Sequence, residues 1–82
     1  MADATFTIVD RVSLGNKVLV VISVSAGADI AASAVGLSAM EYGWLQDVGD
    51  NAGLYITMTS RASWSLSAAP SGGNQLVFIV GY

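Results

Sequence analysis

The side chains of this sequence that could act as acids, bases or metal ligands are nearly all carboxylates. The 82 residues contain no histidine and no cysteine. This absence removes imidazole bases, thiolate nucleophiles, disulfides and the zinc, haem and iron–sulfur sites that need those ligands. Glu41 and the aspartates could form an acid–base pair, but nothing in their spacing makes any two of them converge. We therefore expect no catalytic residue, no cofactor and no enzymatic activity.

Asp47, Asp50 and Asn51 place three oxygen-bearing side chains in a glycine-rich stretch. Calcium takes about six to eight oxygen ligands, and the EF-hand loop spaces them in a fixed pattern. That pattern fails here, because Gly49 holds the third position and Ala52 the sixth. Residues 47–53 are therefore predicted to form a hairpin loop whose polar side chains cap local amides, with no metal.

A second glycine-rich patch, Gly72-Gly73-Asn74, resembles a phosphate loop only in its glycines. Such loops lie between a strand and a helix, and the P-loop also needs a lysine. No helix is expected after residue 74, so a turn is the prediction for this patch.

The composition points to association with protein. Hydrophobic residues make up 54% of the chain and charged residues 11%, with a net charge of −3. Nucleic-acid binding and polybasic membrane binding both need clustered Lys and Arg, so neither is expected. A core of this size gives little stability without staples or partners. We expect an obligate oligomer or an assembly component.

No transmembrane segment or signal peptide is expected. No strictly apolar run is longer than residues 18–22, far short of the ~20 residues of a spanning helix. The first residues, Met-Ala-Asp-Ala-Thr, lack the basic and apolar parts of a signal peptide. Synthesis in the cytoplasm is the simplest expectation.

Alternating apolar and polar residues predict strands over 5–9, 17–25, 40–46, 54–59, 64–67 and 76–82. Residues 10–16 are expected to turn, and 68–75 to form a loop. Between 26 and 38, Asp29 could cap one helical turn that Gly36 closes. The fold class is thus all-β in one domain, 1–82. We expect a small sandwich or partly open barrel of about five or six mainly antiparallel strands.

The alternation also assigns faces. Val18, Val20, Ile22 and Val24 share one face of their strand, with Leu19 and Val21 opposite. Met40, Tyr42, Trp44 and Gln46 are expected on one common face. The last strand, 76–82, is expected to pair within its own subunit.

Large aromatic and arginine side chains are the candidate interface residues, because each combines a large contact area with a polar group. The candidates are Tyr42, Trp44, Tyr55, Arg61, Trp64, Phe78 and Tyr82. Ordinary core packing is the alternative for the aromatics. Trp64, between serines on an expected edge strand, is the first choice for an exposed anchor. Arg11 and Arg61 are expected either to pair with a partner's carboxylate or to lie solvated.

The order of these pieces resembles the small β-rich decoration, or cement, proteins of tailed bacteriophage heads. The resemblance lies in Asp10-Arg11, the step Gly15-Asn16-Lys17, Val35-Gly36-Leu37-Ser38, residues 40–44 and the terminal strand. It implies a non-enzymatic protein on the virion exterior that binds the major capsid protein and stabilises the head. Such proteins are often symmetric oligomers, and on a capsid shell we expect a trimer in preference to a dimer.

Two alternatives remain open beside it. One is a small β-barrel that binds an apolar or sugar ligand, with Tyr42, Trp44 and Trp64 lining one concavity. The other is a tail or neck component of the virion.

Overall fold

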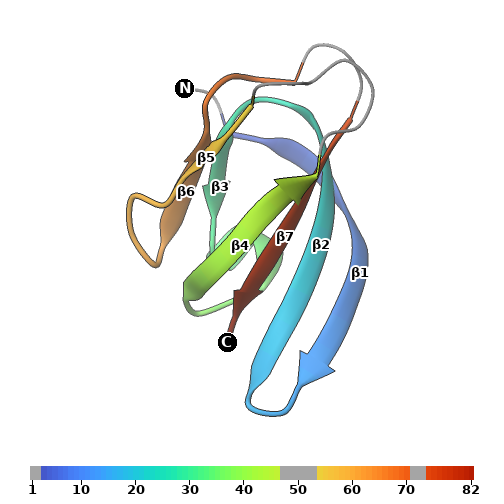
Figure 1. Cartoon of the computed structure of the whole chain (residues 1–82), viewed down its shortest axis with the longest axis vertical. Helices are drawn as coiled ribbons and strands as arrows, with labels where there is room; N and C mark the ends of the chain where they lie inside the picture. The colour runs from blue at the N-terminus through green and yellow to red at the C-terminus, as the bar shows by residue number, and fades with distance from the viewer. Residues whose placement is uncertain (1–2, 47–53, 71–73) are drawn as a thin grey trace.

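Two antiparallel β-sheets make up the computed structural model, which describes residues 3–46, 54–70 and 74–82 (Figure 1). The larger sheet has the order β1 (Thr5–Leu14), β2 (Lys17–Ala26), β7 (Gln75–Gly81) and β4 (Met40–Gln46). The smaller has the order β3 (Asp29–Ala31), β6 (Ser63–Leu66) and β5 (Ile56–Thr57). One 3₁₀ turn, η1 (Ser33–Val35), follows β3. The predicted all-β class is confirmed, as a two-sheet arrangement and not a closed barrel.

The final strand, β7, lies between β2 and β4 and is hydrogen-bonded to both. The expected pairing of residues 76–82 within the subunit is therefore confirmed. The strand predicted over 54–59 is shorter than expected, since only Ile56–Thr57 pair.

The β1–β2 hairpin is longer than predicted. The turn at Gly15, with φ 72°, lies where the Gly-Asn pair placed it. The residues before it, however, continue the strand as far as Leu14. A bulge between Ile8 and Asp10 shifts the register there. This shift breaks the alternation and makes the stretch after Val9 look like a turn in the sequence.

The predicted helical turn after Asp29 is only partly correct. Asp29 does not cap a helix; it opens β3, and its Oδ1 accepts a hydrogen bond of 2.9 Å from Ser65 Oγ. The turn is the short η1, and it ends at Gly36, whose φ of 80° is the left-handed closure expected there.

Arg11 joins β1 to this turn. Its guanidinium donates to the carbonyl oxygens of Val35 at 3.1 Å and Gly36 at 3.0 Å. It is therefore neither the solvated charge nor the partner-facing cation that the sequence suggested. A cation satisfying the last carbonyls of a turn is a favourable placement.

Arg11→Ala is therefore expected to destabilise the fold by about 1–2 kcal/mol, since two charge-assisted hydrogen bonds are lost from a partly exposed site. Urea unfolding followed by circular dichroism measures the effect. Arg61→Ala is the matched control, because its one hydrogen bond to a side chain, 3.4 Å to Tyr82 Oη, is long. Equal effects from the two substitutions would contradict this role of Arg11.

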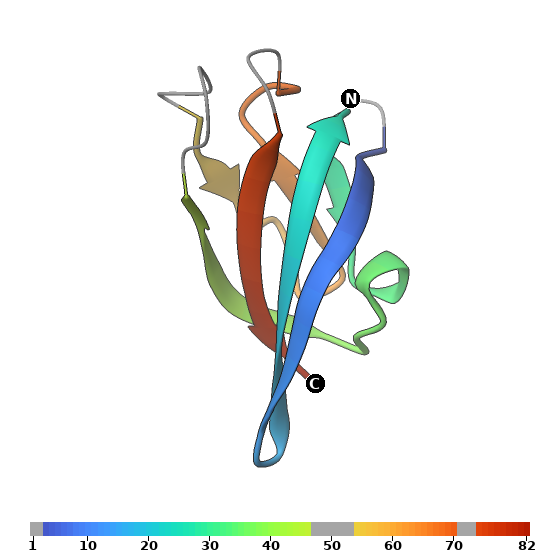
Figure 2. The ribbon, with the colours of Figure 1, turned by 90° about the vertical axis from the view of Figure 1, so that its right-hand side faces the viewer.

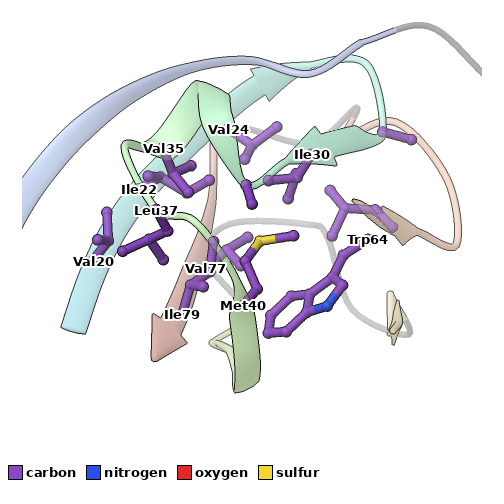
Figure 3. Packing of buried hydrophobic residues seen from close by; sticks show 13 residues of the cluster. Val20, Ile22, Val24, Ile30, Val35, Leu37, Met40, Trp64, Val77 and Ile79 are labelled. Carbon is purple, nitrogen blue, oxygen red and sulfur yellow. The ribbon is translucent and has the colours of Figure 1, made fainter. Parts of the chain in front are cut away.

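The core lies between the two sheets (Figure 3). Trp64 belongs to it and is 1% exposed. The expectation that Trp64 is an exposed anchor on an edge strand is wrong, because β6 is the central strand of its sheet, between β3 and β5. Its serine neighbours alternate away from the core, whereas Trp64 and Leu66 point into it.

Candidate interaction face

The outer face is the side of the four-stranded sheet that turns away from β3, β6 and β5. In Figure 2 this sheet lies in front of the smaller one, and no described segment crosses it. All four strands give it apolar side chains: Val12, Leu14, Leu19, Val21, Tyr42, Trp44, Leu76, Phe78 and Val80. A group of apolar side chains to which every strand of a sheet contributes, with no described segment over it, is typical of an interaction site.

The strand register aligns most of these side chains in rows across the sheet. One row holds Val12, Leu19, Val80 and Tyr42, and the next holds Asp10, Val21, Phe78 and Trp44. A third, mostly polar row holds Thr7, Ser23, Leu76 and Gln46. Neighbouring side chains in a row lie close enough to pack on one another. Val80 is only 3% exposed for this reason, although it lies outside the core cluster between the sheets.

A stacked aromatic pair lies on the β4 side of the outer face. Trp44 and Phe78 are stacked, with ring centroids 5.0 Å apart and planes 3° from parallel. Trp44 is still 47% exposed and its neighbour Tyr42 53% exposed. Large aromatic rings fixed by a neighbour but open on one side are typical of interface anchors.

A bulge in β4 decides which of its residues reach the outer face. The register shifts between Met40 and Tyr42, so Met40 is buried in the core while Tyr42 and Trp44 turn outward. The prediction that these three share one face is therefore wrong for Met40. Gly43 faces the core, since a Cβ there would approach the Trp64 ring.

Charges lie at the margins of the outer face. Lys17, at the start of β2, forms an ion pair with Glu41, and its Nζ lies 5.9 Å from the centre of the Tyr82 ring. Glu41 thus pairs with a cation of its own chain. Asp10, on the edge strand β1, accepts a 2.8 Å hydrogen bond from the backbone amide of Arg11.

The structure brings together some of the candidate interface residues and separates others. Tyr42, Trp44 and Phe78 lie on the outer face, with Tyr82 beside Lys17 at its end. Tyr55 and Arg61 lie in the segments on either side of β5. Arg61 nevertheless lies near the end of the outer face, where its Nη1 donates a 3.4 Å hydrogen bond to Tyr82 Oη.

Aliphatic members of the outer face were not among the candidates: Val12, Leu14, Leu19, Val21, Leu76 and Val80. A signal for some of them exists in the sequence. In residues 18–22 and 76–80, the side chains on both faces of the strand are apolar. A strand with only one buried face would have polar side chains on the other, so this pattern indicates apolar surface on both faces of the sheet.

The ligand-barrel alternative is not supported by the positions of its residues. It requires Tyr42, Trp44 and Trp64 in one concavity, but Trp64 is in the core and the other two are on the outer face. No pocket is found in the described part of the chain. The predicted loop of Asp47, Asp50 and Asn51 lies outside the described residues, as do Gly72 and Gly73.

Within residues 3–46, 54–70 and 74–82, no group of carboxylates is placed to hold a metal ion, and no helix has the length and hydropathy to span a bilayer. Comparison with protein-family models, curated proteins and solved structures found no match for this chain. Among the described residues, the outer face is the candidate functional site.

Proposed function

We propose that this chain is a non-enzymatic structural protein that works as one copy in a larger protein assembly. The observation that carries the proposal is the outer face, an apolar surface contributed by all four strands of the larger sheet. Monomeric soluble proteins rarely expose contiguous apolar patches above a few hundred Å², and such patches mark interaction sites. Burying this surface against protein is the role that its chemistry fits.

Within this class, we propose decoration of the head of a tailed bacteriophage. The resemblance of the sequence to decoration proteins supports this assignment, together with an all-β fold and a charge of −3 that is unsuited to DNA. The partner would be the major capsid protein on the outside of the shell. Many copies bound to one shell act together, so each contact needs only modest affinity.

The test is to locate the chain in purified particles of the phage that carries its gene. Quantitative mass spectrometry is expected to find many copies per particle. Electron cryo-microscopy is expected to show a two-sheet β domain at regular positions outside the shell. Shells already saturated with the chain serve as the control, because they should bind no more of it. Absence of the chain from particles would refute the decoration role. Density for the chain only in the tail or neck would also refute it, and would assign the chain to that part of the virion.

A further inference from the structure

The outer face has the dimensions of a small but specific interface. Four strands at a spacing of about 4.8 Å make a face ~19 Å wide, and three rows of side chains cover ~20 Å along the strands. The projected area is therefore about 400 Å² in each copy. Side-chain relief adds to this figure, so two such faces together bury roughly 1,000 Å², near the lower limit for a specific complex.

The chemistry of the outer face matches a surface like itself. Among the described residues whose pairing places them on this face, Asp10 and Lys17 carry charge and lie on its margins, while Thr7, Ser23 and Gln46 are polar and uncharged. Lys17 is already paired with Glu41. A surface with so few charges offers a foreign partner little to select by, whereas the same apolar surface on a second copy is complementary to it.

The sheet edges are poor places for self-association. The edge strand β1 has register shifts between Thr5 and Phe6 and between Ile8 and Asp10. The other edge strand, β4, has one between Met40 and Tyr42. Bulges of this kind interrupt the row of free amides and carbonyls that a neighbouring strand would need. Two copies are therefore expected to meet by their faces and not by their edges.

The stability of the fold is also expected to increase when the outer face is buried. The smaller sheet, which covers the inner face, has strands of only 3, 4 and 2 residues. Domains this small usually need staples or oligomerisation for stability, and this chain has no disulfide.

From these observations we infer that the outer face packs against the outer face of a second copy, as a two-fold symmetric dimer of face-to-face sheets. The inference rests on the proposed assembly function and names the partner of the outer face. Aligned packing of two sheets about 10 Å apart is the usual geometry of sandwiches. In such a pair the smaller sheets lie on the two outsides, which leaves them free to dock on a shell.

Sedimentation equilibrium from about 1 to 100 µM tests the inference. The wild-type chain is expected to reach twice its mass of 8.4 kDa, and the dimer is expected to persist in 1 M NaCl because its contacts are apolar. Trp44→Glu is expected to weaken dimerisation at least about 100-fold, because it places a charge against the apolar surface of the second copy and removes an aromatic anchor. Tyr42→Lys is a second variant on the same strand.

Tyr55→Glu is the matched control, since Tyr55 is 65% exposed and lies next to the smaller sheet. It should dimerise like the wild type. Near-ultraviolet circular dichroism of the buried Trp64 shows whether each variant is folded.

Three results would overturn the inference: a folded wild-type monomer at 100 µM, a stable trimer, or a dimer that folded Trp44→Glu and Tyr42→Lys both leave intact. Binding to phage shells is measured separately. A monomer that binds shells would refute the face-to-face dimer and leave the proposed function standing. A dimer that binds no shells would support the dimer and refute the proposed decoration role.

Discussion

Trp64→Ala is expected to remove most of the protein's free energy of unfolding at 25 °C. Trp64 is 1% exposed and is the largest of the fully buried side chains. Figure 3 shows its indole beside Met40 in the core between the sheets. Removing a buried tryptophan costs about 3–5 kcal/mol, and a domain of this size has a total stability of only about 5 kcal/mol.

Urea unfolding followed by far-ultraviolet circular dichroism measures this loss. Tyr55→Ala is the control, because it also truncates an aromatic ring, but one that is 65% exposed. The backbone of Tyr55 keeps its bond from Ser67 in that variant, so its effect should stay below about 1 kcal/mol. If Trp64→Ala proved as mild as Tyr55→Ala, Trp64 could not be the core residue described above.

Gly43→Ala is expected to destabilise the fold by about 3 kcal/mol, through a collision and not through backbone conformation. A Cβ at Gly43 would meet the carbonyl oxygen of Phe78 and lie 3.2 Å from Ile79 Cα. Both atoms belong to the backbone of the central strand β7, which cannot move aside. The Trp64 ring, 2.9 Å away, closes the remaining space. Overpacking at such a site costs about 1–3 kcal/mol and occasionally more.

Gly15→Ala separates this effect from the general cost of replacing a glycine. Gly15 has a φ of 72° and nothing within 4 Å of an added Cβ, so only the left-handed conformation opposes alanine there, at about 1–2 kcal/mol. The comparison by thermal or urea unfolding should rank Gly43→Ala as the more damaging substitution. The reverse ranking would mean that β4 and β7 are not packed as closely as described.

Local patterns in the sequence predict the strands but not their neighbours. The alternation in residues 17–25 and 40–46, and the turn at Gly15, follow from backbone geometry that each short segment determines for itself. The position of β6 in its sheet does not follow from local sequence, because serines around Trp64 are equally compatible with an edge strand and with a central strand. Pairing on both sides decides between them, with Ile30 of β3, 34 positions away in the numbering, on one side of Trp64 and with β5 on the other side of β6.

The outer face was predictable only in part, for a related reason. Tyr42, Trp44 and Phe78 were candidates by residue type, and the sheet order β2-β7-β4 unites them with Leu19 and Val21. That order is a long-range property. Bulges such as the one after Met40 add to the difficulty, since one extra residue reverses which side chains face the core.

The central claim is that the outer face is covered by protein when the chain works. Acrylamide quenching of Trp44 fluorescence tests it most directly, with the contribution of Trp44 taken as the difference between the wild type and Trp44→Phe. Trp44 is 47% exposed in the single chain, and Trp64 is buried throughout. We predict that quenching of Trp44 falls several-fold as the protein concentration rises from about 0.1 to 100 µM. Quenching that stays strong across this range, and also in purified particles, would contradict the claim.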